Sequence, residues 1–137
     1  MLRPFLRAKI HRARVTRSDP DYVGSISIDT ELLAAADLLP LEQVDVYNLT
    51  RGTRFTTYCI AGAAGSGEIG VNGAAAHLAT AGELVIIAAY CDLDREEIPH
   101  HRARVVLVGE ANRIAEVRVQ SPFDLPGLNG KREEGRR

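Results

Sequence analysis

The chain has 137 residues, of which 45% are hydrophobic and 26% charged, and its formal net charge is −1 at pH 7. These values are typical of one soluble globular domain that is long enough to bury a core. The near-zero net charge excludes a global electrostatic attraction to nucleic acid or to membranes.

The N-terminal segment carries the strongest local charge. Arg and Lys recur through residues 1–17, which contain no Asp or Glu. These charges interrupt any apolar run of the signal-peptide type, and the longest apolar run, residues 84–91, is too short to span a bilayer. We therefore expect a soluble, cytoplasmic protein with no membrane partner, in which Cys59 and Cys91 are reduced and buried.

Most of the chain is expected to form short strands. Residues 5–15 alternate with period two, which puts Ala8 and Ile10 on one face and Lys9 and His11 on the other. In chain order, the further expected strands are 26–28, 43–50, 54–61, 68–71, 84–90, 102–109 and 114–119. The strands 43–50 and 54–61 are expected to form a hairpin. Because residues 84–90 are apolar throughout, that strand is expected to be buried on both faces.

A helix is expected over residues 29–39, with Asp29 as its N-cap and Pro40 as the limit of its extension. The small residues 72–79 predict a tight turn or a single helical turn. From about residue 120 onward, Pro, Gly and charged residues follow no period, which predicts a disordered tail over 120–137.

Two patterns resemble ligand-binding motifs but lack the required context. Residues 65–70 match G-x-G-x-x-G, yet a strand is expected after them where a dinucleotide-binding fold needs a helix. The histidines are scattered, and none joins a Cys or a carboxylate at the spacing of metal ligands. They are His11, His77, His100 and His101. We therefore expect loop glycines and no metal site.

The dipeptide Gly24-Ser25 lies between a polar turn and the strand 26–28. Glycine tolerates strained dihedral angles, so the Ser25 hydroxyl could reach the Gly24 carbonyl carbon. Attack there would convert the peptide bond to an ester, and elimination followed by hydrolysis would leave a ketone, a pyruvoyl group, in place of the serine. An ordinary hairpin connection is the alternative for so common a dipeptide.

Charged side chains elsewhere suggest a site for a dicarboxylate. Arg54 and Tyr58 share one face of their expected strand, as Lys9 and His11 do on theirs. Arginine pairs with a carboxylate through two donors, and lysine adds a second positive charge. Solvated surface charges are the alternative interpretation.

Five segments, in order and spacing, resemble the pyruvoyl-dependent aspartate 1-decarboxylase family. They are KIHRARVT (9–16), DYVGSISID (21–29), RGTRFTTYCIAG (51–62), VNGAAAH (71–77) and GELVIIAAY (82–90). The resemblance runs from the first residues to about residue 119. It implies a mainly β fold, a six-stranded double-ψ β-barrel with short helices, and a homotetramer with active sites between subunits.

The resemblance also implies a reaction. A decarboxylase domain over 1–119 would cut itself between Gly24 and Ser25 into chains 1–24 and 25–137. The pyruvoyl group made from Ser25 would form a Schiff base with L-aspartate, and loss of the α-carboxylate as CO₂ would give β-alanine for pantothenate and coenzyme A biosynthesis.

The same resemblance implies roles for individual residues. Tyr58 would donate a proton to the carbon that loses CO₂, and Thr57 would assist both self-cleavage and substrate binding. Asn72 would orient the neighbouring loop or the bond that is cut. Lys9 and Arg54 would clamp the two carboxylates, in an assignment that the sequence leaves open. Further carboxylate contacts would come from the backbone N–H groups of Gly73, Ala74 and Ala75.

Three features depart from the family pattern. Val23 stands where the family often carries Glu, and Tyr47 where Trp is more usual. Simple alternation puts Thr57 on the face opposite Arg54 and Tyr58, so a bulge or a site between subunits is expected. Two other functions remain open at this stage: a nucleic-acid-binding β-barrel with a basic arm, and a pyruvoyl enzyme that acts on another acid such as glutamate.

Overall fold

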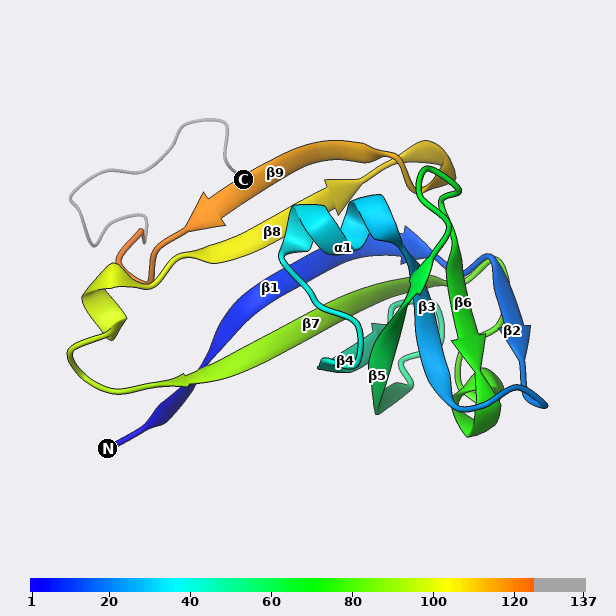
Figure 1. The fold of residues 1–137 in the computed structure, drawn as a ribbon, viewed down its shortest axis with the longest axis horizontal. Coiled ribbons are helices and arrows are strands. Elements are labelled where there is room, and N and C mark those ends of the chain that lie inside the picture. Colours follow the sequence, from blue (N-terminus) through cyan, green and yellow to red (C-terminus); the bar gives the residue numbers. More distant parts are fainter. Residues whose placement is uncertain (125–137) are drawn as a thin grey trace.

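Strands dominate the computed structural model of the chain, which describes residues 1–124 (Figure 1). In chain order its elements are β1 (Arg3–Arg14), β2 (Arg17–Asp19), β3 (Ser25–Asp29), α1 (Thr30–Ala36), β4 (Gln43–Asn48), β5 (Arg54–Gly62), β6 (Ile69–Asn72), the 3-10 helix η1 (Gly73–His77), β7 (Leu84–Leu93), η2 (Ile98–His100), β8 (Ala103–Val108), η3 (Glu110–Asn112) and β9 (Ile114–Gln120). The expectation of a mainly β protein with short helices is confirmed.

The strands pair in the order β2-β6-β3-β5-β4-β7-β1-β8-β9. The expected hairpin is the antiparallel pair β4–β5. Strand β2 was not expected; it pairs in parallel with β6, whose other neighbour is β3. Because β6 lies between β2 and β3, the Gly24-Ser25 segment crosses the end of β6. It is therefore not a hairpin connection between neighbouring strands.

The sheet returns on itself because one nearly continuous stretch of chain pairs in two places. β1 pairs with β7, and β2, which starts three residues after β1 ends, pairs with β6. Between them, the Thr16 N–H donates to the Ile69 carbonyl at 2.8 Å, and the Thr16 hydroxyl accepts from the Ile69 N–H at 3.0 Å. Six strands, β6-β3-β5-β4-β7-β1, lie between these two pairings.

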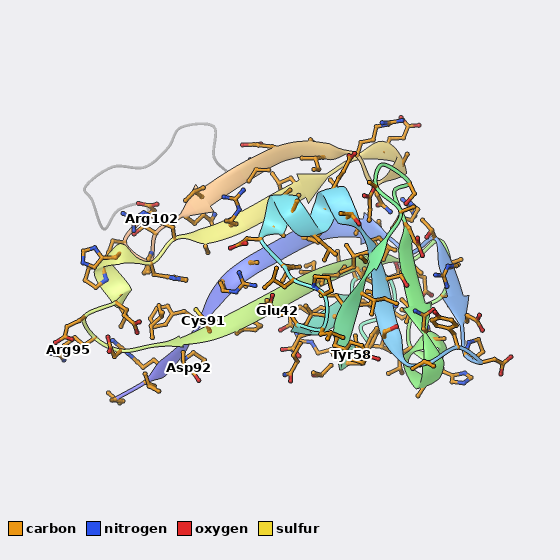
Figure 2. All side chains as sticks on the ribbon, viewed as in Figure 1. Glu42, Tyr58, Cys91, Asp92, Arg95 and Arg102 are labelled. Atoms are coloured by element: carbon orange, nitrogen blue, oxygen red, sulfur yellow. The ribbon has the colours of Figure 1, made fainter. Side chains whose placement is uncertain are left out.

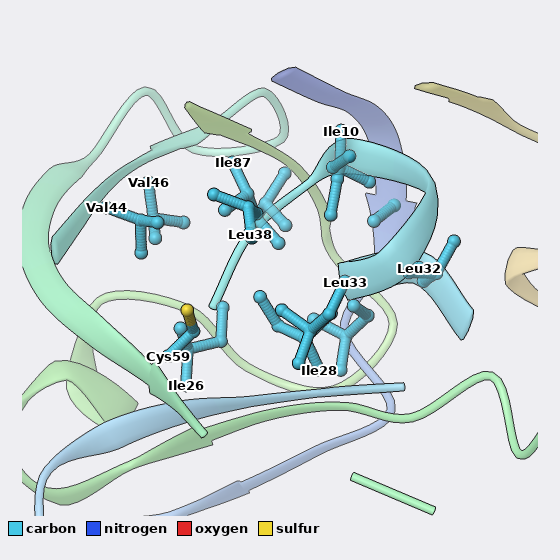
Figure 3. Close-up of a cluster of buried hydrophobic side chains, with 14 of the residues drawn as sticks. Ile10, Ile26, Ile28, Leu32, Leu33, Leu38, Val44, Val46, Cys59 and Ile87 are labelled. Atoms are coloured by element: carbon cyan, nitrogen blue, oxygen red, sulfur yellow. The ribbon is translucent and has the colours of Figure 1, made fainter. Parts of the chain in front are cut away.

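A core of aliphatic side chains fills the inside of this curved sheet (Figure 3). The largest side chains that are less than 2% exposed include Ile10, Ile26, Ile28, Val44, Val46, Ile69, Val71 and Ile87. Burial of each such side chain contributes about 1.5–3 kcal/mol. Cys59 belongs to this core, whereas Cys91 is half-buried, and both are free thiols.

Helix α1 is shorter than expected. Asp29 caps it as expected, because its carboxylate accepts a hydrogen bond from the Glu31 N–H at 2.8 Å. The helix ends at Ala36, since Asp37 adopts a left-handed conformation with φ of 58°. Pro40 therefore does not set the end of the helix.

The G-x-G-x-x-G segment also donates hydrogen bonds to the Asp29 carboxylate. Gly65 and Gly67 have φ of +78° and +72°, and their N–H groups donate to Asp29 at 3.0 and 2.8 Å. Burial alone would raise the pKa of Asp29, but hydrogen bonds from Gly67, Glu31 and Gly65 bring this pKa below its usual value. Strand β6 follows and contains Gly70, so the interpretation as loop residues is confirmed for Gly65 and Gly67 but is wrong for Gly70.

The expectation for residues 84–90 is wrong in part. They belong to a single strand, β7, and Val85, Ile87 and Ala89 are buried. On the other face Ala88 is also buried, but Ile86 is half-buried and Tyr90 is 46% exposed, so this face of β7 is covered only in part.

The predicted tail begins inside the described part of the chain. β9 extends through Gln120, and a turn follows in which the Asp124 N–H donates to the Ser121 carbonyl at 3.1 Å. The rest of the predicted tail, 125–137, lies outside the described residues. Across residues 1–124, none of the helices has the length and apolar character needed to cross a membrane.

Candidate active site

Gly24-Ser25 lies where the chain crosses the end of β6, at the lower right of Figure 1. Although it is polar, Ser25 is only 1% exposed. Its hydroxyl donates to the Val23 carbonyl at 3.3 Å and accepts from Nδ2 of Asn72 at 3.0 Å. Asn72 is fully buried and is also the β6 partner of Ser25 in the β3–β6 ladder. The structure thus brings these two predicted site residues into direct contact.

Gly73 packs closely against Gly24 of the Gly24-Ser25 dipeptide. Its φ is +73°, and a Cβ placed on it would lie 2.6 Å from Cα and 2.9 Å from N of Gly24. No side chain fits in that distance, so glycine is required here for both conformation and space. Ala74 and Ala75 follow in η1, the first exposed and the second half-buried. Small residues therefore bring the η1 backbone against the predicted cleavage site.

Tyr58 lies beside Ser25 on β5, which pairs with β3 on the side opposite β6. The parallel β3–β5 register pairs Ile26 with Cys59. The residues just before them, Ser25 at the start of β3 and Tyr58 in the middle of β5, therefore lie side by side. Ile26 and Cys59 both point into the core, and successive side chains alternate. Ser25 and Tyr58 therefore share the face of the sheet that is turned away from the core, which we call the outer face; Figure 2 labels Tyr58 on β5.

Thr57 lies on the opposite face without a bulge. The β4–β5 ladder runs from the Tyr47–Arg54 pair to the Gln43–Tyr58 pair without a register shift, and Thr57 is paired with the buried Val44. Of the two explanations offered for Thr57, the bulge is wrong. Thr57 is half-buried and borders a shallow depression that Tyr58 also lines.

The two predicted carboxylate clamps are not brought together within one chain. Lys9 pairs with Ala88 on β7, Ala88 pairs with Asp45 on β4, and Asp45 pairs with Thr56 on β5. Three inter-strand spacings, about 14 Å, therefore separate Lys9 from β5, the strand that carries Arg54 and Tyr58. The outer face of the sheet thus carries six polar side chains: Lys9, Asp45, Tyr47, Arg54, Thr56 and Tyr58.

A tyrosine pair supports Arg54 on this outer face. The Arg54 guanidinium carbon lies 4.2 Å from the centre of the Tyr47 ring, and the hydroxyls of Tyr47 and Tyr90 are 2.8 Å apart. Burial and the hydrogen bond with Tyr90 raise the pKa of Tyr47 to about 12. Tyr90 was missed in the sequence, because it lay in a strand expected to be buried on both faces.

His11 is next to this face and carries a buried Nδ1 that has no hydrogen-bond partner among residues 1–124. Burial, and then the charges of Lys9 and Arg12, lower the pKa of His11 below its usual value. Within the same residues, no three His, Cys, Asp or Glu side chains gather where they could hold a metal ion.

Two residues that contact Asn72 were also missed. Arg17 donates to its Oδ1 at 3.0 Å, and Ser27 accepts from its Nδ2 at 3.2 Å. Arg17 belongs to the basic N-terminal stretch, where nothing in the sequence distinguishes it from its neighbours. The β2–β6 pairing that brings it to Asn72 joins residues more than 50 positions apart.

Known proteins match this chain over most of its length. The family model described as Aspartate decarboxylase matches residues 1–115. An aspartate 1-decarboxylase of Legionella pneumophila is 54% identical over 116 residues, which cover 85% of this chain and 87% of that protein. Proteins of the same name from Staphylococcus aureus and Ralstonia nicotianae are 51% and 48% identical, covering 85% and 86% of this chain and 92% and 98% of their own lengths. The chain belongs to the aspartate decarboxylase family.

Proposed function

We propose that the chain is a proenzyme that cuts itself between Gly24 and Ser25 and then decarboxylates L-aspartate to β-alanine and CO₂. The β-alanine would enter pantothenate biosynthesis in the cytoplasm. One observation carries this proposal: the buried Ser25 hydroxyl is held by Asn72 beside a glycine whose carbonyl carbon it must attack.

The proposed self-cleavage needs only the groups around Gly24 and Ser25 and one water molecule. Ser25 Oγ bonds to the Gly24 carbonyl carbon, the C–N bond breaks, and the hydroxyl proton passes to the released nitrogen, which gives an ester. Loss of the Ser25 Cα proton then breaks the ester C–O bond, leaving a Gly24 carboxylate and a dehydroalanine. Water replaces its nitrogen, released as ammonia, and leaves a ketone at the start of the chain 25–137.

The surroundings of Ser25 fit the pyruvoyl group that this sequence of steps would make. Gly73 leaves space for the Gly24 backbone where a Cβ would collide, and the Asn72 side chain faces the oxygen of Ser25. Such a ketone supplies a carbonyl that takes up an amine and accepts the electron pair left by departing CO₂. Cleavage after Gly24 would free the new chain end to move away from Ser25 and open the crossing to substrate, while β1 and β2 stay paired in the sheet.

The chain's own residues would bind and protonate the substrate. Arg54 offers a planar guanidinium, fixed over Tyr47, for one carboxylate, and Lys9 offers an ammonium for the other. Tyr58, beside Ser25 on the outer face, would deliver its phenolic proton to the carbon that loses CO₂. Thr57 and the N–H groups of Gly73, Ala74 and Ala75 would complete the contacts.

Completion of the site would require a neighbouring subunit. Lys9 is about 14 Å from β5 in its own chain, so a second chain, placed against the outer face, would have to bring another Lys9 to Arg54 and Tyr58. This supports active sites between subunits, and the number of subunits, four, rests on the family resemblance. The six strands between the β1 and β6 pairings support a double-ψ β-barrel over a domain that ends near residue 119.

A direct assay tests the activity. Purified protein should release CO₂ from L-aspartate and produce an equal amount of β-alanine, with much less turnover of L-glutamate. Ser25→Ala should show neither cleavage nor turnover while it keeps the wild-type melting temperature. An uncut Ser25→Ala protein that still turns over aspartate would contradict the proposal, and preference for glutamate would change the substrate but keep the chemistry.

Tyr58→Phe separates the two reactions. It removes only the phenolic O–H, so the chain should cut itself normally but lose aspartate turnover by about 100-fold or more, the range of a lost general acid. Cleavage is measured by denaturing mass spectrometry and turnover by β-alanine formation. Full turnover in this variant would remove Tyr58 from the proposed role.

A further inference from the structure

Arg17 holds the side chain of Asn72 on the side away from Ser25. One guanidinium nitrogen of Arg17 donates to Asn72 Oδ1 at 3.0 Å. The other nitrogen donates to Glu68 Oε2 at 2.6 Å and lies 3.4 Å from the hydroxyl of Ser27. Asn72 itself is fully buried, and the side chains that bond its amide are those of Arg17, Ser25 and Ser27.

Two glycines make room for this arrangement. Gly70 is the β6 partner of Arg17, and a Cβ on Gly70 would lie 2.9 Å from the guanidinium carbon of Arg17. A Cβ on Gly62 would lie 2.7 Å from Oε1 of Glu68. The guanidinium and the carboxylate thus occupy spaces that any larger residue at either position would fill.

The chemistry of arginine decides which way the amide faces. A guanidinium donates hydrogen bonds and accepts none, so only the Asn72 carbonyl oxygen can face Arg17. The NH₂ group must then face the two serines, 3.0 Å from Ser25 Oγ and 3.2 Å from Ser27 Oγ. A donor in this place stabilises negative charge on Ser25 Oγ as its proton leaves, whereas the amide oxygen would oppose that charge.

We infer that Arg17 is a positioning residue for self-cleavage: it fixes the Asn72 amide so that an N–H, and not the carbonyl oxygen, faces the attacking oxygen of Ser25. Glu68 and the spaces at Gly62 and Gly70 hold Arg17 in place. The inference rests on the proposed cleavage at Gly24-Ser25 and extends it to a residue that touches neither atom of the bond.

The test follows the appearance of the fragments 1–24 and 25–137 over time by denaturing mass spectrometry. Arg17→Gln can donate or accept, so the amide is free to turn, and cleavage should slow by about tenfold or more. Arg17→Lys only donates, so its rate should stay within about threefold of wild type. Glu68→Gln keeps both Asn72 and Arg17 but weakens the contact that holds Arg17, so it should slow cleavage less than Arg17→Gln does. It serves as a second variant should the first fold poorly.

Two comparisons separate positioning from general stability. Arg118→Gln breaks another Arg–Glu pair, 2.9 Å long and half-exposed on β9, and should cleave at the wild-type rate. In an Asn72→Ala background, Arg17→Gln should cause no further slowing, because the amide through which it acts is gone. Melting temperatures of all variants are measured alongside.

The outcomes also separate this inference from the function on which it rests. If wild type stays intact on prolonged incubation, the proposed self-cleavage fails and the inference falls with it. If wild type is cut and Arg17→Gln is cut equally fast, or is slowed as much with Ala at position 72 as with Asn, the inference alone is overturned.

Discussion

The corner around Ser25 and the outer face of the sheet differ in how complete each is within one chain. The Ser25 hydroxyl is buried and has both of its hydrogen-bond partners in its own chain. On the outer face, by contrast, Arg54 is exposed and Lys9 lies three inter-strand spacings from β5. Under the proposed function, this difference implies that the groups for self-cleavage would lie within one subunit, whereas substrate binding would depend on assembly.

Substitution of Gly73 should have the largest effect on self-cleavage. In Gly73→Ala the added Cβ would lie 2.6 Å from Gly24 Cα, so the Gly24-Ser25 bond must shift. A displacement of this kind should slow cleavage by about 100-fold, measured by mass spectrometry over time.

Gly52→Ala is the matched control for that variant. Gly52 has a similar φ of +79°, but a Cβ there meets nothing within 4 Å. It should therefore lose about 1–2 kcal/mol of stability from backbone strain and cleave at the wild-type rate. Equal slowing in both variants would show that strain, and not contact with Gly24, is responsible.

Assemblies that mix two inactive variants test whether the substrate site joins two subunits. Lys9→Ala and Tyr58→Phe should each have little activity alone, since each lacks one side chain in every site. If the site joins two subunits, equal co-expression should leave both side chains intact in about a quarter of the sites and restore about a quarter of wild-type turnover. Activity no higher than that of the parents would place Lys9 and Tyr58 in the same subunit's site.

Substitution of Tyr47 should have a smaller effect, on substrate binding by Arg54. Tyr47→Leu removes the ring beneath the guanidinium, a cation–π contact at an exposed site, and should raise KM for aspartate about threefold with little change in kcat. Tyr47→Phe keeps the ring and loses only the hydrogen bond to Tyr90, so its KM should stay near that of wild type. A reversed order would assign the effect to the hydroxyl pair.

The smallest effect concerns stability away from both regions. Hydrogen bonds from the Thr80 N–H and from Asn48, together with Arg51, lower the pKa of Glu83 from 4.5 to about 2. The stabilisation from Glu83 is therefore complete above pH 4.5 and disappears as pH falls toward about 2. Glu83→Gln should melt below wild type at pH 7 and close to it near pH 2. A gap that persists at pH 2 would point to lost packing rather than to charge.

Local patterns in the sequence predicted which segments are strands and which residues could be reactive. The alternation around Ala8 and Ile10 and the cap at Asp29 depend on near neighbours in the chain. The reactivity of Gly24-Ser25 stays a prediction that rests on the family resemblance. The order of strands does not depend on near neighbours. Periodicity tells which face a residue occupies, but not which strand lies beside it.

Most of what the sequence missed depends on such pairing. β2 lies beside β6, and this alone brings Arg17 to Asn72 and makes the 20–24 segment a crossover. The continuous β4–β5 ladder decides the face of Thr57. The distance of Lys9 from β5 likewise follows from the position of β7 and β4 between them.

Denaturing mass spectrometry of the purified wild-type protein tests the central claim most directly. The account predicts two fragments, residues 1–24 and 25–137, with the larger lighter by one ammonia than a chain that begins with serine. A single chain of full mass that persists through prolonged incubation, in protein that still decarboxylates aspartate, would contradict it.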